Sequence, residues 1–202
     1  MRVRLRPGRS AEEELSFYAH RYPHGYRHTV WPDHVERVAA SVEFVIRTWN
    51  GAPDAMVADL SCGDGAIASR VCDLTGARPF LGDLVDAGQA DPVGGLTTVG
   101  PLEQTIPLIG LRGPAGLYVC SETLEHLDDP ESVLRALRPV VRSLFVSTPL
   151  GETTDGNVEH YWGWDHDGVF DLLTDCGFTP QSFERFTPES VQQYTFQFWM
   201  CT

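Results

Sequence analysis

The chain has 202 residues, of which 42% are apolar, and this is enough to close the core of one globular domain. Its 28 acidic residues exceed its 15 basic residues, which gives a formal net charge of −13 and disfavours duplex nucleic acid as a partner. The sequence has no run of about 18 apolar residues, no apolar signal segment, and no close pair among its five cysteines. We therefore expect one soluble, cytoplasmic domain over 1–202, a monomer or homodimer with no membrane partner.

The first fifty residues carry basic, helical and aromatic features. Four arginines before residue 10 favour a solvated tail over a guide for an anionic substrate. Two helices are predicted within 11–50, separated by a polar and aromatic interruption at 18–28. Asp33 is the expected N-cap of the second helix. Its apolar stripe would pack on a sheet through Val35, Val38, Val42, Val45 and Ile46.

The aromatic interruption allows two interpretations. As part of a helical lid over 11–50, it would supply aromatic walls for a planar ligand. As a docked helix–loop–helix, it would place the same rings in the core. The aromatic residues concerned are Tyr18, Tyr22 and Tyr26.

Short apolar runs that alternate with helical segments predict a parallel sheet after residue 55. The runs lie at 55–60, 78–84, 95–100, 116–121 and 143–149. A helix over 167–178, ended by Gly177, precedes two further strands at 182–188 and 192–201. We predict an α/β fold with a Rossmann-like core over 55–202. Its doubly wound, mostly parallel seven-stranded sheet would carry an antiparallel C-terminal strand and an N-terminal helical lid.

The stretch VADLSCGDGAIA, residues 57–68, turns from the first predicted strand of this sheet into a helix. Glycines there let backbone amides and a helix N-terminus approach a ligand, although dinucleotide dehydrogenases and structural turns use the same device. Residues 59–65 resemble the first motif of class I S-adenosylmethionine-dependent methyltransferases, with Ser61 in place of the first glycine. The resemblance continues at Asp83, in VCSETLEHLDDP at 119–130 and in STPLG at 147–151.

This resemblance implies S-adenosylmethionine as the cofactor, with its ribose hydroxyls bound by Asp83. Pro101 and Gly116 stand where the family often carries acids, so Leu102 and Glu103 are expected to flank the adenine, whose amine would meet Glu103 or a backbone carbonyl. The full set of implied cofactor-binding residues is Asp59, Ser61, Cys62, Gly63, Gly65, Asp83, Leu84, Leu102, Glu103 and Ser121.

Methyl transfer is an in-line displacement that needs an aligned acceptor, and only some acceptors need a base. Because ligands of open α/β sheets sit at the carboxyl ends of the strands, the SETLEH stretch at 121–126 should border the acceptor. We expect Glu122, His126 and His160 to act as catalytic groups, basic or orienting. The expected acceptor is a small-molecule metabolite, methylated at oxygen or nitrogen. Its aromatic contacts would be Tyr18, Tyr22, Tyr26, Trp162 and Trp164.

Two other functions are compatible with these motifs. On a helical turn, Glu122, Glu125 and His126 share one face, and with His160 they offer four ligands for a divalent cation. This set and EHYWGW at 159–164 resemble the metal-dependent enzymes that methylate the terminal 2′-hydroxyl of small RNAs. The net charge disfavours RNA, and we expect no metal.

A structural interpretation gives these residues no chemistry: the glutamates accept backbone hydrogen bonds at a helix N-terminus and His126 packs under the cofactor. The remaining alternative is a non-catalytic cofactor-binding partner protein. It is motivated by the departures from the family pattern at Ser61, Pro101 and Gly116.

Overall fold

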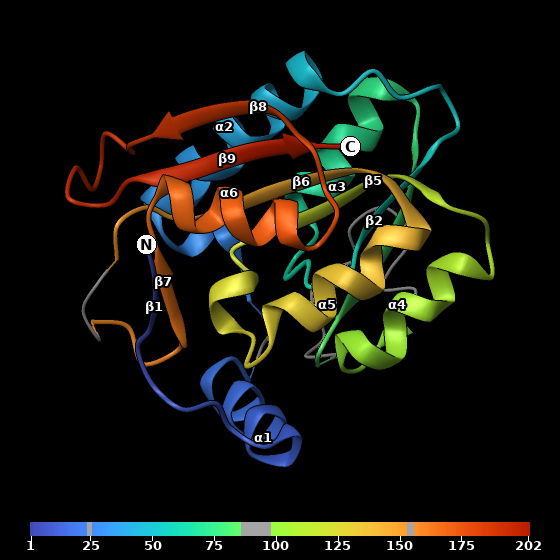
Figure 1. Ribbon diagram of the computed structural model, residues 1–202. Coiled ribbons are helices and arrows are strands. Elements are labelled where there is room, and N and C mark those ends of the chain that lie inside the picture. The colour runs from blue at the N-terminus through green and yellow to red at the C-terminus, as the bar shows by residue number, and fades with distance from the viewer. Residues whose placement is uncertain (24–25, 86–97, 153–155) are drawn as a thin grey trace.

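The computed structural model describes residues 1–23, 26–85, 98–152 and 156–202, and Figure 1 shows helices packed around a central sheet. The α-helices are α1 Ala11–Arg21, α2 Pro32–Thr48, α3 Ala66–Thr75, α4 Leu102–Gly110, α5 Pro130–Leu137 and α6 His166–Asp175. Short 3-10 helices are η1 His28–Val30, η2 Leu124–His126 and η3 Arg138–Val140. The strands are β1 Arg2–Arg4, β2 Met56–Asp59, β3 Arg78–Asp83, β4 Thr98–Val99, β5 Ala115–Ser121, β6 Val141–Pro149, β7 Trp162–Trp164, β8 Pro180–Phe186 and β9 Phe196–Cys201.

Seven described strands form one sheet in the order β4-β3-β2-β5-β6-β9-β8. The pairs β2–β3, β2–β5 and β5–β6 are parallel, whereas β9 runs antiparallel to both β6 and β8. The predicted α/β sheet with an antiparallel C-terminal strand is confirmed. Of the predicted strand at 95–100, β4 covers two residues, and 95–97 lie outside the described residues. Because the strand order reverses between β2 and β5, a ligand site is expected at their carboxyl ends.

Helices cover both faces of the sheet, and each face has its own apolar cluster. Leu117 and Val119 of β5 pack with α2 and α3, whereas Tyr118 and Cys120 of the same strand pack with α4, α5 and α6. Figure 1 shows these two groups of helices on opposite sides of the sheet. The alternation follows from the two-residue period of a strand and explains why the parallel strands read as continuous apolar runs. None of the described helices is long and apolar enough to cross a membrane.

Helix α2 differs from its prediction in its start and in its buried face. Trp31 is the N-cap and Pro32 the first helical residue, which suits proline because that position needs no backbone donor; Asp33 lies within the first turn and is not the cap. Val35 and Ile46 are 47% and 40% exposed, contrary to the predicted stripe. The buried face also contains Arg37, Ser41 and Phe44, and this rotates it away from the two exposed residues.

The N-terminal stretch is ordered, contrary to the predicted solvated tail. Strand β1 pairs antiparallel with β7, and Arg2 lies opposite Trp164. The Arg2 guanidinium also stacks 4.2 Å from the centre of the Trp162 ring and forms an ion pair with Glu131. Backbone pairing and cation–π contacts therefore hold this stretch to the domain.

Helix α1 continues to Arg21, so the predicted interruption begins four residues later than expected. Ser10 and Glu13 form a capping box at its start, and the helix has no buried residue. Within the predicted lid over 11–50, therefore, α2 packs into the core and α1 stays at the surface. Figure 1 shows α1 set apart from the sheet, below the other helices.

Candidate functional site

A cavity of about 350 Å³ lies at the carboxyl ends of β2, β3 and β5, at the point where the strand order reverses. Its volume is within the range of about 300 to 1,000 Å³ that is usual for small-molecule sites. Residues from α1, from the loops after the three strands and from the start of α4 line it. The predicted site residues on its wall are Tyr18, Tyr22, Tyr26, Ser61, Gly63, Asp83, Leu84, Leu102, Glu103, Ser121, Glu122 and His126.

The loop after β2 presents backbone to the cavity. Gly63 has a φ of +56°, and a Cβ atom there would lie 2.8 Å from the Tyr26 ring, so the position requires glycine. Gly65, with φ 72°, is the N-cap of α3. Cys62 is buried in the core and Asp59 accepts a hydrogen bond from the Ser61 amide at 3.2 Å. Asp59, Cys62 and Gly65 therefore shape the loop from behind the cavity wall.

Asp83, at the end of β3, places a carboxylate on the cavity wall. Its Oδ2 accepts a hydrogen bond from the Gly63 amide at 2.7 Å, and its Oδ1 accepts one from the Leu84 amide at 2.8 Å. Burial raises the pKa of Asp83 to about 6, against the opposing effect of these amide donors. Its carboxylate thus connects two loops and is ionised at neutral pH, ready to accept hydrogen bonds from ligand hydroxyls.

The SETLEH stretch does not form the helical face predicted for it. Glu122 precedes η2 and has a φ of 52°, a backbone conformation that costs a non-glycine residue about 1 to 3 kcal/mol. Glu122 accepts a hydrogen bond from the Ser147 hydroxyl at 2.8 Å, and Glu125 accepts one from the Thr148 hydroxyl at 3.1 Å. The glutamates thus contact hydroxyls of β6 and do not cap a helix, because the left-handed turn at Glu122 separates their directions.

His126 lies on the cavity wall with its ring half-buried. Its Nδ1 is 3.1 Å from the Glu159 carbonyl oxygen and 3.0 Å from the Tyr18 hydroxyl. Because a carbonyl can only accept, Nδ1 carries the hydrogen and Nε2 keeps a lone pair. Burial, with a smaller contribution from neighbouring His160, lowers the pKa of His126 to about 3. The ring is therefore neutral at physiological pH.

His160 lies beside His126 but is absent from the cavity wall. The two rings meet edge to face with their centres 4.8 Å apart. Nδ1 of His160 lies 2.5 Å from a Glu152 carboxylate oxygen, and its Nε2 lies 3.0 Å from Asn157 Nδ2. Both ring nitrogens thus have protein partners.

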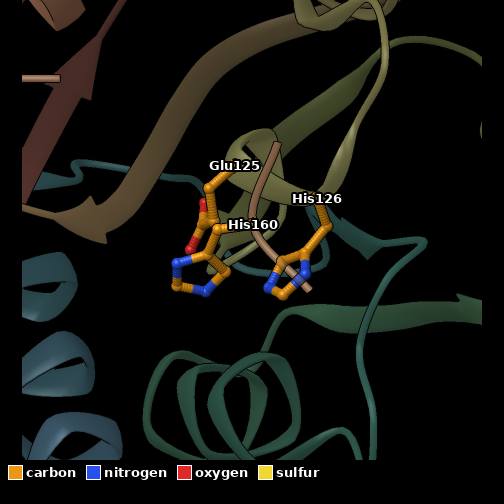
Figure 2. A group of neighbouring side chains, drawn as sticks. All are labelled: Glu125, His126 and His160. Carbon is orange, nitrogen blue, oxygen red and sulfur yellow. The ribbon is translucent and has the colours of Figure 1, made fainter. Parts of the chain in front are cut away.

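Figure 2 shows Glu125, His126 and His160 gathered together. One ligand atom from each lies within 4.8 Å of the others, and Oε1 of the buried Glu125 has no hydrogen-bond partner. Glu122 does not belong to this group, so three of the four predicted alternative metal ligands come together. Burial and the nearby charge of Glu122 raise the pKa of Glu125 well above its usual range.

Three tyrosines of the N-terminal region cover the cavity. The buried Glu159 holds one of them, Tyr22, because its carboxylate accepts a hydrogen bond from the Tyr22 hydroxyl at 3.1 Å and another from the Arg21 guanidinium at 2.8 Å. The Tyr161 hydroxyl also bonds Glu14. Polar contacts from 159–161 therefore fasten α1 over the cavity.

Two predicted acceptor-contacting residues lie elsewhere. Trp164 is fully buried in the core, and its indole N–H donates to the Thr148 hydroxyl at 2.8 Å. The guanidinium groups of Arg2 and Arg4 stack over the Trp162 ring. Pairing between β1 and β7 holds both residues in place, and neither indole lines the cavity.

Three further residues on the cavity wall are Arg37, His28 and Glu159. Sequence reasoning missed Arg37, and it included the other two only as members of the aromatic interruption and of the 159–164 stretch, with no separate role. Arg37 is 2% exposed, and its Nη1 donates to the Ser121 hydroxyl at 2.8 Å. A charged residue beside Val38 on an otherwise apolar helix stripe was the available signal. His28 was hidden in the aromatic interruption, where its Nδ1 lies 2.5 Å from Asp64 and ties that segment to the loop after β2.

No protein-family model and no curated protein sequence matches the chain, but many solved structures share its architecture. Magnesium protoporphyrin IX methyltransferase from Synechocystis PCC 6803, with bound S-adenosylhomocysteine, is 16% identical with a TM-score of 0.65, over 92% of this chain and 93% of that one. The 1,6-didemethyltoxoflavin-N1-methyltransferase of Burkholderia thailandensis is 15% identical with a TM-score of 0.67, over 99% and 93%. Mycolic acid cyclopropane synthase CmaA1 is 10% identical with a TM-score of 0.61, over 83% and 85%. The fold is that of class I S-adenosylmethionine-dependent methyltransferases.

Proposed function

We propose that the protein is an S-adenosylmethionine-dependent methyltransferase that acts on an oxygen or nitrogen atom of a small molecule. One observation carries the proposal: a single cavity brings together the glycine turn after β2, the Asp83 carboxylate and the His126 ring. Comparable folds that bind S-adenosylhomocysteine and are named as small-molecule methyltransferases support it.

The residues that line the cavity after β2 and β3 and at the start of α4 fit an adenosyl group. Gly63 leaves space that a side chain would fill, the Asp83 carboxylate can accept two ribose hydroxyls, and Leu102 offers an apolar surface at the start of α4. Gly116 does not face this region: a Cβ atom there would lie 2.9 Å from Ala55, so close strand packing accounts for its lack of an acid. When bound, S-adenosylmethionine supplies an electrophilic methyl group on a sulfonium.

His126, which lines the cavity after β5, can orient a methyl acceptor. Its Nε2 lone pair can accept a hydrogen bond from a hydroxyl or amine, while the Glu159 carbonyl fixes the tautomer. The low pKa keeps the ring neutral, so it adds no positive charge beside a sulfonium. Glu122, on the same wall, would stabilise positive charge that develops on the acceptor as it is methylated.

The cover over the cavity favours a small, planar acceptor. Tyr18, Tyr22 and Tyr26 form an aromatic wall, and the Tyr18 and Tyr22 rings stack with their centres 6.2 Å apart. Such a wall excludes water from the reaction and packs against flat ligands. A macromolecular acceptor would require α1 to move away.

The group of Glu125, His126 and His160 favours a second candidate, the metal-dependent methylation of RNA 3′ ends. One carboxylate and two imidazoles suit a divalent transition metal, and the unpartnered Glu125 Oε1 is available as a ligand. However, His160 would have to give up its contact with Asn157 or Glu152. We therefore place this candidate second.

Transfer of a labelled methyl group separates these functions. The wild type, His126→Ala and the control His20→Ala, whose side chain is exposed on α1, are incubated with labelled S-adenosylmethionine and either a small-metabolite extract or RNA. We expect label in the metabolite fraction, unaffected by a chelator and reduced about 100-fold in His126→Ala, with unchanged affinity for S-adenosylhomocysteine.

Each other outcome identifies a different function. Chelator-sensitive labelling of RNA would support the second candidate and contradict the first. Binding of S-adenosylhomocysteine without any methyl transfer would indicate a non-catalytic cofactor-binding partner protein.

A further inference from the structure

Glu122 is an acid on the cavity wall with no cation directly beside it. Three other acids of this wall each form an ion pair with an arginine of the N-terminal region: Glu14 with Arg9, Asp128 with Arg4 and Glu159 with Arg21. Within the described part of the chain, Glu122 forms no ion pair, and only its Oε1 takes part in a hydrogen bond. Its Oε2 is therefore free to meet a ligand that carries positive charge or an N–H donor.

A chain of hydrogen bonds fixes the other oxygen of this carboxylate. Arg37 Nη1 donates to the Ser121 hydroxyl at 2.8 Å, the Ser121 and Ser147 hydroxyls lie 2.8 Å apart, and Ser147 donates to Glu122 Oε1 at 2.8 Å. Because each hydroxyl has one hydrogen and a carboxylate only accepts, all donors point from Arg37 towards Glu122. The chain joins a cation to an anion through two hydroxyls, which stabilises both charges and holds Glu122 in place.

An aromatic wall lies in the same cavity. The Tyr18 and Tyr22 rings stack with their centres 6.2 Å apart, and the Tyr22 and Tyr26 rings meet edge to face at 5.4 Å. Burial raises the pKa of Tyr26, and the charge of Glu122 adds to this effect against the opposing charge of Arg37. The carboxylate is therefore close to this end of the wall. Faces of aromatic rings attract cations, so the wall and Glu122 favour the same kind of ligand.

These groups discriminate between oxygen and nitrogen as the atom that is methylated. An alcohol or phenol has to give up its proton to a base when it is methylated, whereas the lone pair of a neutral amine needs no base. Burial lowers the pKa of His126 to about 3, which makes its ring a weak base at neutral pH. The negative charge of Glu122 would also repel an oxyanion.

We propose that the methyl acceptor is an amine and that Glu122 binds its nitrogen. This inference rests on the proposed function, because it requires S-adenosylmethionine in the cavity. An N–H of the amine donates to Glu122 Oε2, while the rest of the acceptor packs against the tyrosine wall. The sulfonium of the cofactor is a cation of the same chemistry, and the experiments below distinguish these two sources.

Glu122 favours the transfer because it stands where positive charge arrives. The nitrogen lone pair forms a bond to the methyl carbon, and the carbon–sulfur bond breaks with its electrons left on sulfur. Positive charge thus moves from sulfur to the nitrogen beside the carboxylate, which stabilises it. A primary or secondary amine then releases one proton to water.

The position of the transferred methyl group tests the proposal in the wild type, so the test remains decisive if a variant fails to fold. The protein is incubated with a small-metabolite extract and S-adenosylmethionine that carries an isotope-labelled methyl carbon. NMR of the product distinguishes a methyl group on nitrogen from one on oxygen. We expect the label on nitrogen, and label on oxygen would overturn the proposal.

Calorimetric titration with two probes tests the role of Glu122. Phenyltrimethylammonium resembles a methylated amine, and tert-butylbenzene has the same shape without the charge. With S-adenosylhomocysteine at saturation, we expect the wild type to bind the cation about tenfold more tightly than the neutral probe. Glu122→Gln keeps an acceptor for Ser147 and should remove most of this preference. The control Glu12→Gln, which removes one charge from the exposed side of α1, should leave it unchanged.

The remaining outcomes separate the two cations and the two proposals. Equal binding of both probes to the wild type would overturn the proposal. So would a preference that survives Glu122→Gln while that variant binds S-adenosylmethionine more weakly and S-adenosylhomocysteine as before, because the carboxylate would then face the sulfonium. If the wild type does not bind S-adenosylhomocysteine, or binds it and methylates no small molecule, the proposed function itself fails.

Discussion

Helices α1 and α2 precede the first strand of the large sheet, but they join the domain in different ways. Six residues of α2 are buried, and none of α1 is. Helix α1 is held by hydrogen bonds and ion pairs such as that between Arg21 and Glu159. Few buried apolar contacts imply a low free energy of local opening. We infer that α2 is a fixed wall of the cavity and α1 a cover that can open.

The largest effect should come from the core face of α2. Phe44 is 2% exposed, and its ring lies 5.9 Å from Phe145 and 5.8 Å from Phe198, centre to centre. Phe44→Ala should lower the free energy of unfolding by about 3 to 5 kcal/mol, measured by denaturant titration. The matched change on α1, Leu15→Ala, removes a side chain that is 47% exposed and should cost less than about 0.5 kcal/mol. Similar costs would contradict the distinction between the two helices.

In the fixed part of the site, the contribution of Asp83 to the free energy of unfolding should depend on pH. Because burial raises the pKa of Asp83 from 3.8 to about 6, the folded protein binds more protons than the unfolded chain between these values. Stability from this group is therefore complete below about pH 4 and is lost as the pH rises through 6, by about 3 kcal/mol. Unfolding curves of the wild type and Asp83→Asn should diverge over this window, and a pH-independent difference would contradict the assignment.

At Glu13 on α1, stability changes with pH in the opposite direction to that expected from Asp83. Hydrogen bonds with Ser10 lower the pKa of Glu13 at the start of α1. Its contribution to stability is therefore present above the pKa of the unfolded chain and is lost as the pH falls through the folded pKa. Low pH therefore destabilises the N-terminal cap of α1. It also protonates Asp83 and so removes the cost of its buried charge.

A smaller and local effect should follow from the release of α1. Glu159→Gln removes the charge that holds Arg21 and Tyr22. Amide hydrogens of α1 should then exchange about tenfold faster, whereas those of α2 should keep their rates. The control Arg47→Gln, which removes a surface ion pair of α2, should leave exchange in α1 unchanged. Faster exchange in both helices after Glu159→Gln would mean that they open as one unit.

The contrast between the two helices also shows what could be predicted from the sequence. Continuous apolar runs predict the parallel sheet, and Gly63 and Gly65 predict the ligand-binding turn after its first strand, because both are local signals. Pairing between β1 and β7 joins segments that are far apart in the sequence. The three residues of β1, two of them arginine, are too few to show the alternating pattern of a strand. The N-terminal stretch was therefore predicted as a tail.

Errors at the site have a similar origin. A helical face was assumed for SETLEH, but the left-handed backbone at Glu122 depends on its contacts with β6. Arg37 was overlooked because a single charge beside an apolar stripe predicts an exposed residue. It is buried because it shares the core-facing side of α2 with Ser41 and Phe44.

Amide hydrogen exchange with and without S-adenosylhomocysteine tests the central claim most directly, because it locates the ligand and compares both helices in one experiment. We predict protection at 61–65, at 83–85, at 100–103 and throughout α1, with no change in the core-facing turns of α2. No protection at 61–65 and 83–85 with saturating ligand would contradict a cofactor site at the carboxyl ends of β2 and β3.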